Sequence, residues 1–339
     1  MSRSERASIE TDVRRRAPWI GAALVLAALV VLLVGASVGS TGWDSLRDAW
    51  HDPVAWQIVR DIRLPRTLGA WLTGALLGLA GAVAQGLFRN PLADPFLLGS
   101  ASGAALAVAA LLALWGAPVA ASSWLVKLGV TGAAFVGALG GVLLTLMLAR
   151  GVQHTLRLLL AGVVVGYVLG AIKDLLSLAA PDILTGMLAF MLGNTGFIGW
   201  SAVVLMTLVL VPLALLAWAL ARVLDGLSLG EATARSLGLP LAPMRALLIG
   251  VLALATGTAV AQTGLIAFVG LAAPHLVRGL ARMTHGPLVL LSALMGGLLL
   301  MVADVGARVL IAPQELPVGV LTAVLGGGYL LWLMYRRTR

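Results

Sequence analysis

Apolar runs of about 20 residues follow one another along almost the whole chain, and each is long enough for a helix that crosses a bilayer. Of the 339 residues, 60% are hydrophobic and only 11% are charged. In a soluble domain about a quarter of the residues are charged. A soluble protein could not bury so much apolar surface. The sequence therefore predicts an all-α integral membrane protein with about ten transmembrane helices.

The apolar runs place the helices within one domain. The predicted spans are residues 18–38, 64–87, 95–115, 125–149, 156–178, 200–222, 243–262, 264–281, 287–308 and 317–335. A short amphipathic piece near 184–196 is not expected to be a full span, and only the Gln262–Gly264 break separates the seventh span from the eighth. The first run is longer than the apolar part of a signal peptide and has no clear cleavage site, so we expect it to be retained. The prediction is a single transmembrane domain, 18–335, with short cytoplasmic tails at 1–17 and 336–339.

Lysine and arginine set the expected orientation. Most of the 23 Lys and Arg residues flank span ends on the same side as the N-terminus, where Arg14–Arg16 precede the first span. Cytoplasmic loops of membrane proteins carry an excess of these residues. We therefore expect a multi-pass protein of the bacterial inner (plasma) membrane with both termini in the cytoplasm.

Four arginines break this pattern at the outer ends of the spans. Arg60, Arg63 and Arg66 cluster at the outer mouth of the second span, and Arg308 lies at the outer end of the ninth. One interpretation is anchoring at lipid headgroups or pairing with nearby acids such as Asp304. The other is a basic surface that orients an acidic external partner. The charge pattern alone leaves both interpretations open.

The longest polar loop, 223–243, is expected on the cytoplasmic side. Ser228 followed three residues later by Glu231 is typical of a capping box that begins a short helix. Gly238 would end that helix and Pro240 would prevent its return. Such a helix can receive force from a cytoplasmic protein, and the alternative is an ordinary amphipathic connector.

The sequence lacks the motifs of an enzyme that works alone. It has no G-x-x-x-x-G-K-[ST] phosphate-binding loop, no Cys, and four scattered His residues. We therefore predict no catalytic residue, metal site or cofactor on this chain, and no nucleic acid partner. Any ATP and Mg²⁺ that drive the protein are expected on a partner chain.

Two rival functions need features that the sequence does not show. An ion-coupled secondary carrier needs ionisable side chains near the bilayer midplane, but Asp174 and Asp304 fall near the ends of predicted spans. A membrane-embedded enzyme needs a clustered catalytic constellation. Neither rival explains outer arginines together with a polar inner loop.

Four blocks of the sequence resemble one transporter family. They are R-L-P-R-T-L-G-A-W-L-T-G-A-L-L-G-L-A-G-A-V-A-Q-G-L-F-R-N-P-L-A-D-P-F-L-L-G at 63–99, L-S-L-G-E-A-T-A-R-S-L-G-L-P at 227–240, G-L-I-A-F-V-G-L-A-A-P-H-L-V-R at 264–278, and 303–319 with A-D-V-G-A-R and E-L-P-V-G. In content and order they are similar to the permease subunits of type II ABC importers for ferric siderophores, haem and cobalamin. The resemblance covers nearly all of the chain beyond residue 55.

The resemblance implies import of a metal chelate by alternating access. Permeases of this family have ten helices, work as homodimers in membrane lipid, and pair with two cytoplasmic ABC ATPase subunits, which bind ATP and Mg²⁺. A periplasmic or lipid-tethered substrate-binding protein delivers the chelate. The blocks do not reveal which chelate is carried, so we expect a ferric siderophore or haem, with cobalamin as a close alternative.

The resemblance also assigns roles to individual residues. Those that match the binding-protein docking arginines are Arg63, Arg66 and Arg308, although an ion pair between Asp304 and Arg308 stays open as an alternative. Those implied for the cytoplasmic gate are Asn90, Leu92, Thr155 and Leu156, with simple loop packing as the alternative. At Leu156 the family commonly has a small polar residue.

Further residues match the family's ATPase-coupling segment. They are Leu229, Gly230, Glu231, Ala234, Arg235 and Gly238, to which His275 and Arg278 near the end of the eighth span are added. The small residues Ser100, Ser102, Gly103 and Ala104 fit a wide pathway lining, or else close helix packing.

The chain departs from the family at its last predicted span. The family usually reads G-x-P-x-F there, whereas this chain has Gly326–Gly328 followed by Tyr329 and Leu330. Three consecutive glycines are expected to loosen the start of the last helix.

Overall fold

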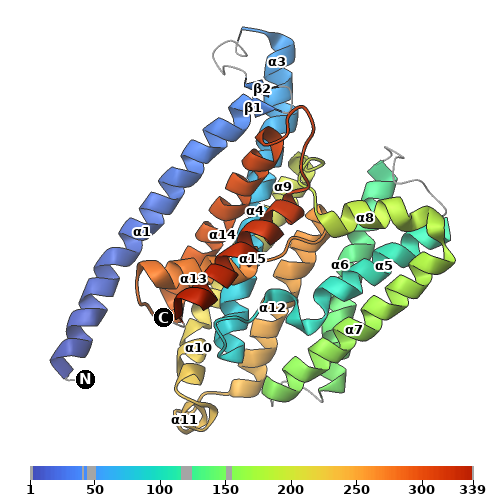
Figure 1. The fold of residues 1–339 in the computed structure, drawn as a ribbon. Helices are drawn as coiled ribbons and strands as arrows, with labels where there is room; N and C mark the ends of the chain where they lie inside the picture. The colour runs from blue at the N-terminus through green and yellow to red at the C-terminus, as the bar shows by residue number, and fades with distance from the viewer. Residues whose placement is uncertain (1–2, 40–41, 44–50, 116–123, 150–154, 338–339) are drawn as a thin grey trace.

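The chain forms a helical bundle, seen in a computed structural model that describes residues 3–39, 42–43, 51–115, 124–149 and 155–337 (Figure 1). Within these ranges the elements are α1 (Arg3–Ser37), β1 (Val38–Gly39), β2 (Gly42–Trp43), α3 (Pro53–Ile58), the π-helix η1 (Val59–Arg63), α4 (Leu64–Phe88), the 3₁₀-helix η2 (Pro95–Leu98), α5 (Ser100–Trp115), α6 (Trp124–Leu148), α7 (Thr155–Ala179), the 3₁₀-helix η3 (Pro181–Ile183), α8 (Leu184–Leu192), α9 (Trp200–Ala219), α10 (Ala221–Ser228), α11 (Glu231–Ser236), α12 (Leu241–Thr263), α13 (Val269–Leu280), α14 (His285–Val309) and α15 (Val318–Arg337). Strands β1 and β2 are two-residue antiparallel partners.

Three helices form the centre of the bundle. In the most apolar stretch of α3–α4, 89% of the residues are buried, and α12 and α14 are also mostly buried. In α7 the corresponding share is 17%, and α1, α6 and α9 are similarly exposed. In a membrane protein, a helix that is apolar on all sides but exposed on the surface of the bundle faces lipid. The burial therefore separates a protein-facing centre from a lipid-facing ring.

Small residues allow α4 and α14 to touch along their backbones. A Cβ atom at Gly74 would lie 2.2 Å from the carbonyl oxygen of Gly296, and one at Gly78 would lie 2.2 Å from that of Ser292. Glycine at such positions is typical of close helix pairs in membranes. The backbones of α4 and α14 therefore lie in direct contact at these glycines, with no side chain between them, and the two helices form a close pair.

The predicted spans correspond to the observed helices, although ten is an approximate count. In the described part of the chain, seven helices are long and apolar enough to cross a membrane. The other three predicted spans match α5, α13 and α15. The short piece near 184–196 is confirmed as α8, and the break before Gly264 is confirmed as the end of α12.

The eighth predicted span, 264–281, is shorter than expected. Residues 264–268 are not helical, and α13 has only 12 residues. At 1.5 Å per residue, it is about 18 Å long, against a hydrocarbon core of about 30 Å. Alone, α13 cannot span the bilayer.

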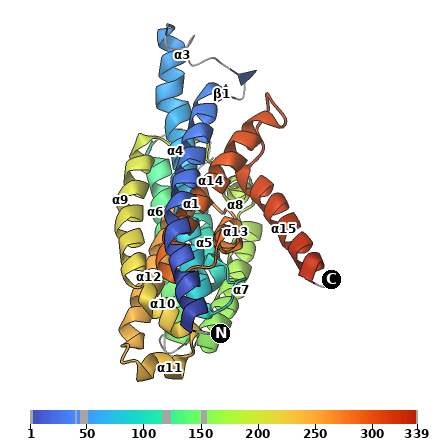
Figure 2. The same ribbon diagram turned by 90° about the vertical axis from the view of Figure 1, so that its left-hand side faces the viewer.

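The expected loosening of the last helix is wrong. Helix α15 is continuous through Gly326–Gly328. A Cβ at Gly326 would lie 2.4 Å from the Cβ of Phe268, which itself has a left-handed φ of 68°. The glycine therefore lets α15 pack on Phe268, although Figure 2 shows the helix leaning away from the bundle towards its C-terminus.

The bundle has two distinct ends. Helix α3 and the β1–β2 pair lie at one end, here called the α3 end, and α11 lies at the other, here called the α11 end (Figures 1 and 2). The N-terminal part of α1 lies on the side of the α11 end. Helices α4 and α14 run between the two ends in opposite directions.

Candidate functional site

A buried ion network joins the helices at the α3 end. Its centre is Asp304 of α14, a fully buried carboxylate. Nε of Arg66 donates to Asp304 Oδ1 at 3.1 Å, Arg308 forms a short ion pair with the other oxygen, and Thr195 also donates to the carboxylate. The second arm of Arg66 pairs with Glu315, Nη1 to Oε2 at 2.8 Å. Buried charges need such partners because losing water is costly.

Two arginines of this end bind the end of α1. Arg308 Nη1 donates to the carbonyl oxygen of Gly35 at 2.9 Å, and its Nη2 donates to Thr67 Oγ1 at 3.0 Å. Arg63 Nη1 donates to the carbonyl oxygen of Ser37 at 3.2 Å. These carbonyls lie in the last turn of α1, where no helical N–H is available to them. The arginines thus connect α1 to α4 and α14.

The three arginines expected to dock an external protein are therefore buried within the chain. Arg63, Arg66 and Arg308 all have partners inside it, including the Asp304–Arg308 pair that the sequence left open. Arg60 differs, since its side chain is 70% exposed and only loosely paired with Asp61 at 3.9 Å. The docking role stays a prediction, and among the arginines that the structure describes at this end Arg60 is the accessible one.

The α11 end is built from two short helices, and the predicted capping box is wrong. Ser228 is the last residue of α10, and its hydroxyl donates to the Asp225 carbonyl oxygen at 2.6 Å. Gly230, with a φ of 104°, is the N-cap of α11. A left-handed residue is needed there to turn the chain between the helices, and glycine adopts it without strain. The predicted end of the helix at Gly238, φ 77°, is confirmed.

Glu231 ties the start of α11 to α12. Its Oε1 accepts from Arg245 Nη1 at 2.6 Å and from Arg235 Nη2 at 3.3 Å. Desolvation alone would raise the pKa of Glu231, but the hydrogen bond and charge of Arg245, with the charges of Arg235 and Arg89, lower it below its ordinary value. The carboxylate is therefore charged at neutral pH, and it holds α11 against the rest of the bundle.

The outer face of α11 is open. Leu229 and Leu237 are 65% and 63% exposed, and Arg235 and Gly238 are also exposed, whereas Ala234 is buried against α10. Two exposed leucines beside a charged arginine form a mixed surface at the tip of the molecule.

Asp225 of α10 holds the beginning of α14. Its Oδ1 accepts from the backbone N–H of His285 at 2.9 Å and lies 2.7 Å from Nδ1 of the same residue. Desolvation would raise the pKa of Asp225, but these hydrogen bonds and the charge interaction with His285 lower it below its ordinary value. Asp225 is thus an ionised carboxylate at the N-terminus of a long helix.

The predicted gate residues lie in exposed segments next to α4 and α7. Asn90 Oδ1 accepts from the N–H of Leu92 at 2.9 Å, and both residues are exposed. Leu156, in the first turn of α7, is exposed too, whereas the side chain of Thr155 lies outside the described residues. The gate stays a prediction.

Asp94 closes the same loop. Its Oδ1 accepts from the N–H of Phe96 at 2.8 Å and caps η2. Burial raises the pKa of Asp94 to about 6, despite the lowering effect of the Phe96 N–H. Its charge therefore changes within the range of pH in which cells live.

The small residues at the start of α5 are used mainly in packing. Ser100 is buried, and a Cβ at Gly103 would lie 2.2 Å from the Gly137 carbonyl oxygen of α6. Ser102 is half-buried and lies near Gly166 of α7. Within one chain this arrangement is the packing alternative, and a role in lining a pathway stays a prediction.

His275 and Arg278 of α13 contact other helices of the chain. The His275 ring lies edge-on to Tyr329 of α15, with centroids 5.9 Å apart. Arg278 Nη1 donates to Gln85 Oε1, and Gln85 Nε2 donates to the Leu271 carbonyl oxygen at 3.1 Å. Their predicted coupling role therefore stays untested, and their observed contacts join α13 to α15 and α4.

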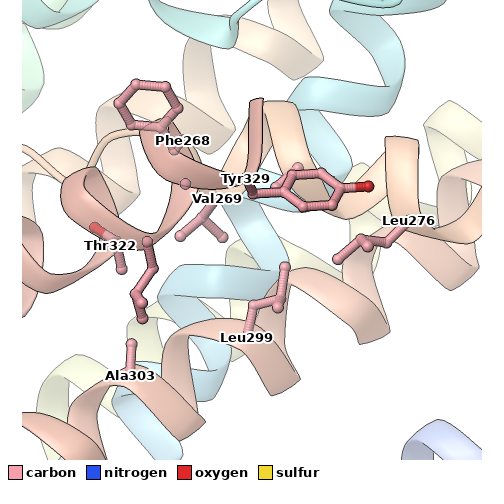
Figure 3. A pocket seen from close by; sticks show the side chains of 10 residues that line it. Phe268, Val269, Leu276, Leu299, Ala303, Thr322 and Tyr329 are labelled. Atoms are coloured by element: carbon pink, nitrogen blue, oxygen red, sulfur yellow. The ribbon is translucent and has the colours of Figure 1, made fainter. Parts of the chain in front are cut away.

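An apolar cavity of about 240 Å³ lies where α15 leans away from α13 and α14 (Figure 3). Phe268, Leu276, Leu299 and Tyr329 are among its described lining residues, and none of the described ones is charged. The cavity offers van der Waals contact but no group that would fix an ion.

Sequence reasoning missed several residues of these networks. Arg245 lies inside an apolar run. Because a buried arginine needs a partner, this position could have indicated an ion pair. Glu315 belongs to the E-L-P-V-G block but received no role. Thr195, and the pairing of Asp225 with His285, join segments far apart in the sequence. No local pattern indicates such contacts.

Comparison with known proteins gives full-length matches. The sequence matches the FecCD transport family over residues 23–336. The hemin transport system permease protein HmuU of Yersinia pestis is 38% identical over 93% of this chain and 96% of that protein. The vitamin B12 import system permease protein BtuC of Shigella boydii is 38% identical over 96% and 97%.

Solved structures agree with the sequence matches. A metal-chelate-type ABC transporter in an inward-facing conformation has a TM-score of 0.84 at 28% identity, over 94% of this chain and 99% of that one. PsaBC from Streptococcus pneumoniae has a TM-score of 0.53 at 22% identity, over 78% and 88%, and shares the fold alone.

Proposed function

The chain belongs to the FecCD transport family, and from that premise we propose that it is the permease subunit of an ABC importer for a metal chelate. The observation that carries the proposal is the full-length similarity to two import permeases. The structural match to a metal-chelate-type ABC transporter also supports it. The chain supplies the membrane pathway and catalyses no reaction itself.

The α11 end is the proposed binding surface for a cytoplasmic ABC ATPase. The exposed Leu229 and Leu237 support this assignment, because they lie at the tip of the bundle and beside an arginine rather than along the lipid-facing ring. The exposed Arg16 and Arg89 agree with a cytoplasmic α11 end by the positive-inside rule. Two ATPase subunits, each with ATP and Mg²⁺, would serve two copies of the chain in the inner membrane, with both termini in the cytoplasm.

A second copy of the chain completes the proposed pathway. In one chain, α15 leans outward and exposes Val324, Leu325 and Leu331. A second copy would cover part of this apolar surface, and lipid would cover the rest.

The α3 end is the proposed docking site for a substrate-binding protein. Among the described residues of this end Arg60 is an accessible cation, whereas Arg66 is mostly buried and paired with the more exposed Glu315. An acidic residue of the binding protein would therefore meet Arg60 first and compete with Glu315 for Arg66. Arg63 and Arg308 would act by fixing the shape of this surface.

Alternating access is the proposed mechanism. The binding protein docks at the α3 end, and nucleotide binding acts at the α11 end. Each event shifts the equilibrium between two arrangements of the dimer, by as much as the binding partner prefers one arrangement over the other. Among the chelates, haemin and cobalamin are tested first because the 38% identical relatives are named for them. A ferric siderophore is the third candidate.

Uptake by reconstituted vesicles tests the function. The chain is purified from its native membrane with its bound ATPase and is placed in vesicles with the binding protein, and labelled haemin, cobalamin and a ferric siderophore are supplied in parallel. We expect one chelate to accumulate only when ATP is present on the ATPase side. Uptake that ignores ATP and follows an ion gradient would show a secondary carrier instead.

A further inference from the structure

We propose that Asp225 and His285 form the joint through which movement of α10 and α11 reaches the α4–α14 pair. The inference rests on the proposed function, because it takes α11 as the surface to which the ATPase binds. Breaking the joint is expected to separate ATP hydrolysis from transport. Asp225 and His285 act as positioning residues, since neither has to touch the chelate or the nucleotide.

The joint is a helix cap supplied by another helix. The first N–H groups of a helix have no partner within it and favour a negative charge. The N-cap residue of α14, Thr284, makes no capping hydrogen bond with its side chain. Asp225, 60 residues away in the sequence, supplies the carboxylate instead and bonds both the backbone and the ring of His285.

This cap resists separation of α10 from α14. A carboxylate accepting two hydrogen bonds forms a charge-assisted contact, which is stronger than a neutral one. Moving α10 would leave the start of α14 uncapped. The last turn of α4 lies against the same joint, because a Cβ at Gly86 would lie 3.0 Å from His285 Nε2 and 3.1 Å from Leu224 of α10. Three helices therefore meet at this point.

The α4–α14 pair can carry the movement to the other end. The two helices touch backbone to backbone at Gly74 and Gly78, so movement of α14 is passed directly to α4 along this contact. Helix α14 has 25 residues, and it is about 37 Å long at 1.5 Å per residue. Its far end carries Asp304 and Arg308 of the buried ion network. One rigid pair thus connects the ATPase side with the docking side.

A second charged contact, between Glu231 and Arg245, does not replace this joint. It ties α11 to α12, which lies at the buried centre of the bundle and packs on α4 rather than on the start of α14. Of these two acidic residues, Asp225 is the one that contacts α14. The geometry therefore singles out Asp225, rather than Glu231, as the direct connection to α14.

Variants of the joint are tested in the complete ATPase complex in vesicles of phosphatidylethanolamine and phosphatidylglycerol. We compare D225A, H285A, the double variant and H285N, in which the amide nitrogen can replace Nδ1 as donor. D182A, which removes an exposed aspartate of η3, is the matched control. The readouts are ATP hydrolysis, uptake of haemin or cobalamin, and the thermal midpoint.

We expect D225A to lower the chelate moved per ATP at least five-fold while hydrolysis stays nearly unchanged, and to lower the thermal midpoint by only a few degrees through loss of the cap. The double variant should match D225A, because paired residues are not additive, and H285N and D182A should behave like the wild type. An unchanged ratio would overturn the joint. So would a proportional fall of hydrolysis and uptake together with a lower thermal midpoint, which would show a structural role only.

A distance measurement tests the joint without any chelate. The chain has no Cys, so spin labels can be placed at Ala232 of α11 and Leu290 of α14, which are both exposed. We expect the distance between them to stay the same when ATP is added to the wild type, and to change or broaden in D225A. Equal behaviour of both proteins would overturn the joint, whereas absence of ATP-driven uptake in the wild type would count only against the proposed function.

Discussion

The two ends of the bundle use charged side chains in opposite ways. At the α3 end, Arg63, Arg66 and Arg308 are buried and bound to Asp304, Glu315 and carbonyl groups of α1. At the α11 end, Arg235 and two leucines are exposed, and single carboxylates connect the short helices to the core. One end is locked by a network, and the other is attached at a few points.

The difference shows that similar residues do different work according to burial. A buried ion network costs desolvation but fixes one arrangement, and losing one member leaves others without a partner. Exposed pairs contribute little to stability. We therefore expect substitutions at the α3 end to act on stability, and those at the α11 end to act on partner binding and coupling.

The largest effect is expected for Asp304→Asn. Arg66 and Arg308 would lose the charge of their shared buried partner, and breaking such a pair costs about 3–5 kcal/mol. Thermal unfolding of the purified chain in detergent, followed by tryptophan fluorescence, measures the loss. The control D174N removes an exposed carboxylate beside Lys173 and should change stability by less than about 1 kcal/mol. Equal effects of both variants would contradict the idea that burial makes the charges of the α3 end important for stability.

A smaller loss is expected for Gly78→Ala in the α4–α14 contact. The new Cβ would lie 2.2 Å from the Ser292 carbonyl oxygen, so the helices must separate. Overpacking of this kind costs about 1–3 kcal/mol. G140A is the matched control, because nothing lies within 4 Å of a Cβ there. If both variants unfold at the wild-type temperature, the two helices do not form a rigid pair.

Leu237→Asp should leave stability unchanged and weaken ATPase binding. The side chain is exposed at the α11 end, and a charge there would face the apolar part of the proposed interface. A loss of roughly 1–2 kcal/mol, or about 10-fold in affinity, is typical of an interface residue that matters. Titration of the purified ATPase onto the reconstituted chain measures it, with L237M as the control. Unchanged affinity would move the interface away from α11.

The smallest effect is expected for Asp94→Asn, and it depends on pH. The pKa of Asp94 rises from 3.8 in the unfolded chain to about 6 when folded. The protonated form therefore stabilises the fold below pH 4, and this contribution is lost as the pH rises through 6. Asn caps η2 equally well without a charge. We expect D94N to unfold about 2 °C above the wild type at pH 8, with no gain at pH 4. A gain that is the same at both pH values would contradict the raised pKa.

The helices could be predicted well from the sequence, because a helix that crosses a bilayer requires a long apolar run. The sequence located the α12 break at Gly264 and the short α8, and it identified the coupling-like segment. It misplaced the start of α11, because the capping-box pattern at Ser228 competes with the left-handed turn that Gly230 allows. The interpretation of Gly326 was also wrong. A glycine is needed there because α15 packs closely on Phe268, and it does not loosen the backbone.

The sequence could not show which arginines are accessible. Arg60, Arg63 and Arg66 look alike as a basic cluster, but a helix turn separates the exposed one from the buried ones. Their partners come from α1, from α14 and from the segment before α15. Contacts between segments so distant in sequence depend on the packed bundle, which one sequence alone does not specify.

The ion network also sets an order in biosynthesis. Arg66 and Asp304 are 238 residues apart, so at roughly 5–20 residues per second a ribosome needs about 12 to 48 s to add the carboxylate after the arginine. During that interval α4 is in the membrane with Arg66 near its end, where a long side chain can reach the headgroups. In a nascent chain, Arg66 therefore lacks its carboxylate partner until α14 is inserted. The ion network of the α3 end forms only when the last third of the protein has been made.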